Sequence, residues 1–145
     1  MATKETAKSV QHIEPGRRPE VIVEFLFDHG LLFISVNNIG DRGAVNVSVK
    51  FDQKIIGLGG SKDISQLPLF RSLQFLGPKR EIVTFVDSSA SYFGSKQPAH
   101  ITARISYQDS DSRQYNDIIR HNLEVFRDLI YLDQNQTDNY PKAEV

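Results

Sequence analysis

The glycine-rich run from Gly57 to Lys62 is one part of this sequence whose composition could support chemistry. Closely spaced glycines let backbone N–H groups converge on an anion, and a nearby lysine can neutralise it. In a P-loop, however, the lysine directly follows the last glycine and precedes a Ser or Thr. Here Ser61 separates Gly60 from Lys62, and Asp63 follows. We therefore expect an ordinary connection and no phosphate site.

The four histidines could bind a metal only if several of them met in space. His12, His29, His100 and His121 contain no i, i+4 pair and no neighbouring ligand cluster of the kind that zinc requires. His100 and His121 lie on segments that we expect to form a hairpin, where cross-strand neighbours can meet. We favour a solvated pair on the outer face over a metal site.

Asp109 and Asp111 match the first two carboxylates of a calcium loop. Arg113 stands where the next oxygen ligand is needed, and neither the Gly nor the terminal Glu of such a loop follows. We expect a polar, exposed hairpin turn, which gives no reason for a shifted carboxyl pKa. The serines of the 88–91 segment lie in no G-x-S-x-G motif. The sequence thus predicts a non-enzymatic protein with no catalytic residue, metal or cofactor.

The charge balance argues against a nucleic-acid partner. The 145 residues contain 17 Lys and Arg against 18 Asp and Glu, whereas nucleic-acid surfaces usually carry a basic excess. Several aromatic side chains could in principle stack on bases, but we expect them to pack in the core: Phe33, Phe51, Tyr92, Phe93, Tyr107 and Tyr115. The sequence has no Cys, so a disulfide framework is excluded.

The two ends of the chain are polar. Residues 1–19 lack the apolar run of a secretory signal, and residues 133–145 lack spaced apolar side chains. We expect both to be mobile tails. No window approaches the roughly 18 consecutive apolar residues of a membrane span. We therefore expect a soluble, cytoplasmic protein that does not insert into membranes, with one domain over residues 20–132.

Alternating apolar and polar residues predict most of the elements that position these side chains. Because side chains of a strand point alternately to opposite faces, a period of two indicates a half-buried strand. This pattern predicts strands over 20–27, 31–38, 44–51, 80–86 and 100–107. The 115–131 segment is ambiguous, since Ile119, Leu123, Phe126 and Ile130 fit helical spacing. The preceding strand needs a partner, so we favour a strand to about Val125.

The segment between Phe51 and Gly77 breaks the alternation. Its glycines and proline suggest a short strand within a structured crossover, and its apolar residues are too many to leave in water. We expect them to plug one open end of the fold, and we also consider them a candidate partner-binding rim: Leu67, Leu69, Phe70, Leu73 and Phe75. The 87–98 segment is expected to be a connection anchored by Tyr92 and Phe93. Seven or eight short strands without a long helix predict an all-β, antiparallel two-sheet sandwich.

Three stretches carry a resemblance to a known family. SVNNIGDRGAVNVSVKF, LPLFRSLQFLGPKREI and ISYQDSDSRQYNDII resemble segments of prokaryotic immunoglobulin-like domains of the CARDB-like type, in which a V-x-N-x-G-x-x-x-A-x-N-V pattern recurs. The similarity covers roughly residues 20–126. It implies an immunoglobulin-like sandwich with adhesion, assembly or binding roles, and it supplies no catalytic residue.

The function predicted from the sequence is a non-enzymatic module that binds a protein partner or itself through a sheet edge or the rim of residues 64–76. Open sheet edges offer main-chain hydrogen bonds to a partner strand. Two alternatives stay open: a small-ligand-binding protein with a pocket under the 57–76 crossover, and a structural subunit of a larger particle.

Overall fold

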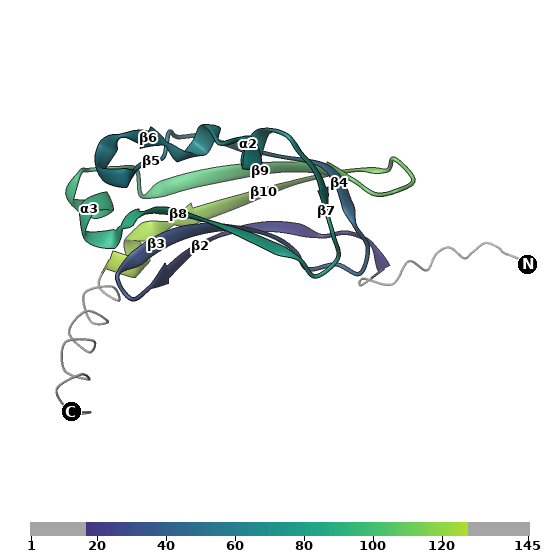
Figure 1. Cartoon of the computed structure of the whole chain (residues 1–145), viewed down its shortest axis with the longest axis horizontal. Helices are drawn as coiled ribbons and strands as arrows, with labels where there is room; N and C mark the ends of the chain where they lie inside the picture. Colours follow the sequence, from purple (N-terminus) through teal and green to yellow (C-terminus); the bar gives the residue numbers. More distant parts are fainter. Residues whose placement is uncertain (1–16, 128–145) are drawn as a thin grey trace, which may run out of the picture.

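The computed structural model describes residues 17–127, which form an antiparallel β-sandwich (Figure 1). One sheet has the order β2-β3-β8, and the other has the order β10-β9-β4-β7. The bounds of these strands are β2 Val21–Asp28, β3 Leu31–Asn38, β4 Ala44–Phe51, β7 Leu73–Leu76, β8 Glu81–Ser88, β9 His100–Gln108 and β10 Gln114–Asn122. The all-β sandwich expected from the alternation is confirmed.

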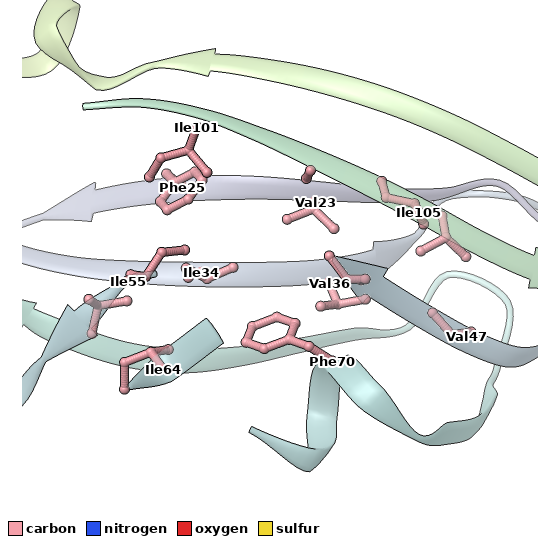
Figure 2. Close-up of a cluster of buried hydrophobic side chains, with 14 of the residues drawn as sticks. Val23, Phe25, Ile34, Val36, Val47, Ile55, Ile64, Phe70, Ile101 and Ile105 are labelled. Carbon is pink, nitrogen blue, oxygen red and sulfur yellow. The ribbon is translucent and has the colours of Figure 1, made fainter. Parts of the chain in front are cut away.

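The core lies between the two sheets. In β3, Leu32, Ile34 and Val36 are fully buried, and Ile101 and Ile105 of β9 face them from the other sheet (Figure 2). Alternation produces this arrangement, because every second side chain of each strand points inward. The strands predicted near residues 20, 31, 44, 80 and 100 all begin within one residue of the expected position.

The crossover between β4 and β7 forms a series of short elements along one side of the sandwich (Figure 1). They are β5 Ile56–Gly57, η3 Leu58–Gly60, β6 Lys62–Asp63, η4 Ile64–Gln66 and α2 Pro68–Arg71. Ile55, Ile64 and Phe70 of this segment are buried in the core (Figure 2). The Phe70 ring meets the Phe51 ring edge to face at 5.0 Å between centroids. These apolar residues of the crossover are therefore buried as expected, but the segment runs along one side of the sandwich rather than across an open end (Figure 1).

The connection after β8 contains a helix, α3 Ser89–Gly94. The Ser88 hydroxyl oxygen accepts a hydrogen bond from the Ser91 N–H at 3.0 Å, so Ser88 is the N-cap. Tyr92 is buried and its hydroxyl donates to the Pro98 carbonyl at 2.7 Å, which anchors the segment as expected. Phe93 is partly buried against the core.

The last strand is shorter than predicted. β10 pairs with β9 from Gln114 to Asn122, and the chain then forms η5 Leu123–Phe126, so the prediction of a strand to Val125 is wrong for residues 123–125. The Asn122 side chain accepts a hydrogen bond from the Glu124 N–H at 3.0 Å and ends the strand. Residues 128–131, and most of the two expected tails, lie outside the described residues.

The folded domain begins before Glu20. Pro19 is buried, and the Arg18 guanidinium lies 5.3 Å from the centroid of the Tyr115 ring. The expected tail of residues 1–19 therefore includes two residues that pack on the sandwich. No helix within residues 17–127 is long and apolar enough to cross a membrane.

Candidate protein interaction surface

Strand β8 lies at an edge of the three-stranded sheet, and part of that edge is open. β3 pairs with one side of β8. On the other side the β5–η3 segment covers only the C-terminal end: Gly57 packs against the Val86 carbonyl, and the Gly59 N–H donates to Asp87 Oδ2 at 3.1 Å. Residues Glu81–Phe85 are left without a neighbouring strand in the described chain. We call them the open edge.

The register shows which backbone groups the open edge presents. The Asn38 N–H donates to the Arg80 carbonyl at 2.9 Å, one step beyond the pair Asn37 and Glu81. Hydrogen-bonded and non-hydrogen-bonded pairs alternate along an antiparallel ladder. Ile82 and Thr84 therefore turn their backbone groups toward β3, opposite Val36 and Ile34. The N–H and C=O groups of Glu81, Val83 and Phe85 point away from β3, toward the free side.

Apolar side chains cover the outer face of the sheet beside the open edge. Val83 is 46% exposed and Phe85 is 38% exposed, and the Phe85 ring meets Phe33 of β3 edge to face at 5.7 Å. Leu31 lies on the same face and is also exposed. We call Leu31, Phe33, Val83 and Phe85 the outer apolar face. The solvent side of an antiparallel sheet is usually polar, so this group is unusual for an outer face.

A hydrogen bond joins β3 and β8 beside the outer apolar face. Ser35 lies between Phe33 and Asn37 on β3 and opposite Val83, yet its side chain is fully buried. Its hydroxyl donates to Glu81 Oε2 at 2.5 Å. This hydrogen bond holds Glu81 at the start of the open edge and directs its carboxylate toward β3.

The other outer strands of the two sheets are protected in familiar ways. Natural sheets blunt their edges with charges, short strands or coverings. β10 exposes Asp117 and Arg120 and only one large apolar side chain, Ile118, at 47%. β2 carries Glu24 and Asp28, and β7 is four residues long. β8 thus combines length, an apolar outer face and unpaired backbone groups.

The five residues that the sequence singled out for partner binding do not form one surface. Phe70 is fully buried, so it cannot contact a partner while the domain is folded. Leu67, Leu69 and Leu73 are partly buried against the core. Phe75 is 60% exposed, and its ring lies over Gly43, where an added Cβ would come within 2.5 Å of the ring. Core packing explains why most of this rim is not available.

Phe75 and Ile82 line an open groove of about 540 Å³ at the β7–β8 turn, together with residues 76–78, 80 and 81. A second groove of about 360 Å³ lies between β4 and residues 71–74. Both lie at the β7 side of the sandwich and are lined in part by residues 71–76 of the 57–76 crossover, under which the sequence suggested a ligand pocket. The first groove adjoins the open edge and extends its apolar surface.

The two histidines considered for a cross-strand pair do not meet. His100 pairs with Asn122 and His121 pairs with Ile101, so the two histidines occupy adjacent positions and point to opposite faces. His121 faces inward, with its ring edge to face against Phe25 at 4.9 Å. Burial lowers the pKa of His121, although the nearby Val23 backbone and the charge of Glu24 partly oppose this effect.

Asp109 is buried, contrary to the expectation of an exposed carboxylate. Its Oδ1 accepts hydrogen bonds from the N–H groups of Asp111 and Arg113 at 2.9 Å, and its Oδ2 accepts one from the Tyr115 hydroxyl at 3.0 Å. Burial alone would raise the pKa of Asp109, but these bonds and the charge of Arg113 outweigh it and hold the pKa below 3.8. The carboxylate organises the β9–β10 turn.

The remaining candidate residues serve local structure. Gly57 approaches the Val86 carbonyl too closely for any side chain, and Gly59 and Gly60 have positive φ angles in the loop that follows. Lys62 lies in β6 and is exposed. Within residues 17–127 no three side chains of His, Cys, Asp or Glu come together as a metal site would require.

Comparison with known proteins assigns the chain to a family. The family described as "Domain of unknown function (DUF8453)" matches residues 1–127, which include the whole sandwich. The chain belongs to this family. No curated protein and no solved structure matches the chain.

The sequence analysis named a sheet edge as one binding surface but did not identify which strand forms it, although the sequence contains a signal for β8. Both faces of the 81–86 segment are apolar, with Ile82 and Val86 on one and Val83 and Phe85 on the other. A strand in a half-buried position needs only one apolar face. The second apolar set was the observation that pointed to a contact surface.

Proposed function

We propose that this DUF8453 domain is a non-enzymatic protein-interaction module, and that its binding surface is the open edge of β8 with the outer apolar face. The observation that carries the proposal is that Val83 and Phe85 are exposed on a strand whose outward backbone groups have no partner within the described residues. Such a strand attracts another strand through both hydrogen bonds and apolar contact.

The two parts of the surface have complementary roles. The outward N–H and C=O groups of Glu81, Val83 and Phe85 would give a partner strand main-chain hydrogen bonds, which provide affinity with little dependence on sequence. Val83, Phe85 and Phe33 would contact alternate side chains of that strand and select apolar ones. A protein segment in extended conformation meets both requirements.

The nearly balanced charge of the chain, 17 basic against 18 acidic residues, favours a protein over a nucleic acid as the partner. The polar side chains first considered for chemistry have structural roles that support a non-enzymatic function. Asp109 organises a turn, the Ser88 hydroxyl accepts a hydrogen bond from the Ser91 N–H, and the Ser91 hydroxyl donates to Asp87 Oδ2.

The test compares two matched variants in affinity capture from source-cell lysate. Val83→Lys places a charge on the open edge, whereas Ile118→Lys makes the same change on β10 at almost the same exposure, 46% against 47%. We expect the amount of protein captured by Val83→Lys to be at least about tenfold lower than the amount captured by the wild-type domain. Ile118→Lys should capture as much as the wild type. Equal capture by all three proteins would overturn the proposal. Thermal unfolding of each variant checks that the fold is intact.

We also propose that the sandwich is immunoglobulin-like, as the resemblance to CARDB-like domains implies. The seven strands of the two main sheets can be counted in chain order as β2, β3, β4, β7, β8, β9 and β10. The first, second and fifth form one sheet, and the third, fourth, sixth and seventh form the other. Constant-type immunoglobulin domains divide their strands similarly, except that their fourth strand joins the fifth. Here the fourth strand, β7, pairs with the third, β4. This division of the strands supports the immunoglobulin-like fold that the resemblance implies.

A further inference from the structure

We propose that the occupant of the open edge is a second copy of this chain, whose β8 pairs antiparallel with the first about a two-fold axis at Val83. The two three-stranded sheets then join into one continuous sheet. This inference rests on the proposed function, because it uses the same surface and names the partner. Two-fold dimers are the commonest assemblies of soluble proteins, and in them one patch contacts itself.

The extent of the open edge sets the position of the axis. It runs from Glu81 to Phe85, bounded by the 77–80 turn on one side and by the covering of Val86 and Asp87 by Gly57 and Gly59 on the other. Val83 is its central residue. A two-fold axis there pairs Val83 with Val83 of the second copy, and Glu81 with Phe85 of the second copy. Pairing ends on both sides where the open edge ends.

The backbone groups match in this register. Glu81, Val83 and Phe85 are the residues whose N–H and C=O groups point outward, and the proposed register opposes these residues only to one another. Each outward N–H thus faces an outward carbonyl, which is the condition for a hydrogen-bonded antiparallel pair. Ile82 and Thr84, whose groups are used by β3, face each other across the axis.

Charge and covering exclude the neighbouring registers. A shift of two residues in one direction would oppose Glu81 to Asp87, whose edge is occupied by the Gly57–Gly59 segment. A shift in the other direction would oppose Glu81 to Val83 and bring the two Glu81 carboxylates into diagonal positions, about 7–8 Å apart. In the proposed register the two Glu81 residues are four strand positions apart, about 14 Å. The Val83 axis keeps the carboxylates separate.

The absence of Cys from the chain allows a clean cross-linking test. In the proposed dimer the two residues at position 83 have a Cα–Cα distance of about 5.5 Å, within the range of a disulfide. Purified Val83→Cys, Glu81→Cys, Phe85→Cys and Ile118→Cys chains are oxidised gently and separated on a denaturing gel. The Ile118 variant is the control for random collision, because Ile118 is as exposed as Val83 and lies on a different edge.

We expect Val83→Cys to form a covalent dimer at least about tenfold faster than Ile118→Cys. Glu81→Cys alone is expected to stay uncoupled, whereas a mixture of Glu81→Cys with a size-tagged Phe85→Cys chain gives a mixed dimer. The mixture tests the register even if Val83→Cys folds poorly. Equal rates for positions 83 and 118, or coupling of Glu81→Cys to itself, would overturn the inference. If Val83→Lys still abolishes lysate capture in that case, the proposed function stands with a different partner.

Discussion

At the scale of single residues, His121 is a titratable group whose protonation is constrained by its surroundings. Its Nε2 is buried without a hydrogen-bond partner, and burial lowers its pKa below 6.5. The unfolded chain therefore binds a proton at a higher pH than the folded chain does. Because stability rises with pH wherever the unfolded state binds more protons, the free energy of unfolding should fall as the pH drops below about 6.5.

This prediction is checked with chemical unfolding between pH 7.5 and 5. Wild type should lose stability over that range, and His121→Gln should lose less. His29→Gln is the control for the loss of an exposed histidine, because the His29 side chain is mostly exposed beside Asp28. Identical pH profiles for wild type and His121→Gln would show that His121 does not cause the dependence.

Asp109 gives a second prediction at this scale. Replacement by Ala leaves the N–H groups of Asp111 and Arg113 and the Tyr115 hydroxyl without their acceptor. We expect Asp109→Ala to lower the free energy of unfolding by roughly 1–3 kcal/mol. Its lowered pKa means that this stabilisation is present above about pH 4 and is lost as the pH falls through the folded-state pKa. Urea unfolding at pH 7 and pH 3 measures both effects.

The exposed Asp111 is the matched control for Asp109. Its backbone N–H donates to Asp109, but the change Asp111→Ala keeps that N–H. We expect a stability change within about 0.5 kcal/mol, as for most surface substitutions. A loss from Asp111→Ala equal to that from Asp109→Ala would contradict the assignment of the turn to Asp109.

At the scale of elements, Asn38 joins three segments that are distant in sequence. Its Nδ2 donates to the carbonyls of Arg42, Leu76 and Gly77, and its Oδ1 accepts from the N–H groups of Glu20 and Gly40. The start of β2, the β3–β4 turn and the β7–β8 turn are thus connected through one buried side chain. This role explains the N-x-G part of the pattern that resembles CARDB-like domains.

Asn38→Ala should therefore destabilise the domain by several kcal/mol, since each buried group left unpaired costs roughly 1–3 kcal/mol. The neighbouring Asn37→Ala is the control, because Asn37 lies on the outer face and its loss should change stability by about 0.5 kcal/mol or less. Thermal and urea unfolding compare the two. Similar losses at both positions would contradict the connecting role of Asn38.

Two phenylalanines at the end of the crossover and the start of β7 differ in burial and can be compared directly. Phe70 of α2 is fully buried, whereas Phe75 of β7 is 60% exposed. We expect Phe70→Ala to cost about 3–5 kcal/mol, as for other large core residues, and Phe75→Ala to cost about 1 kcal/mol or less. Urea unfolding of the two variants checks the difference. If Phe75→Ala costs as much as Phe70→Ala, the crossover does not stabilise the core through Phe70 as described.

The sequence could predict the strands because each has to bury one face, and a period of two reports that requirement directly. The apolar pattern was less informative where a strand and a helical turn would both bury the same residues. Leu123 and Phe126 are three residues apart and both pack on the core, which a 3₁₀ turn also allows. The helical spacing in that segment thus correctly indicated the helical turn Leu123–Phe126. The α3 helix was missed although Ser88 is a typical N-cap.

The sequence shows the apolar residues of the candidate surface, but it could not show which of them are exposed. Whether Phe70 or Phe75 is exposed depends on how the crossover folds over the sheets, and the two have the same side chain in similar local sequence. Likewise, the openness of β8 depends on the covering of Val86 by Gly57, which is 29 residues away along the chain. Local patterns contain no record of these long-range contacts.

At the scale of the whole molecule, the sandwich has an asymmetric arrangement of edges. One side ends in strands with charged or polar residues, β2 and β10, and the other in β7 and β8. The β7–β8 side contains the exposed Phe75, Val83 and Phe85, and the groove lined by Phe75 and Ile82. Contacts with other chains should therefore concentrate on this side, in line with the proposed role of the domain.

Amide hydrogen exchange gives a prediction that depends on the whole arrangement of β8. The amides of Ile82 and Thr84 bond to β3 in every copy, so they should be protected at any protein concentration. The amides of Val83 and Phe85 point to the free side and should exchange rapidly in dilute solution. If two copies pair as proposed, these two amides become protected as the concentration rises, while Ile82 and Thr84 hardly change. NMR-detected exchange at two concentrations resolves this alternation, and Val83→Lys should remove the concentration dependence. Protection of all four amides in dilute solution would instead mean that the outward side of β8 is already covered within a single chain.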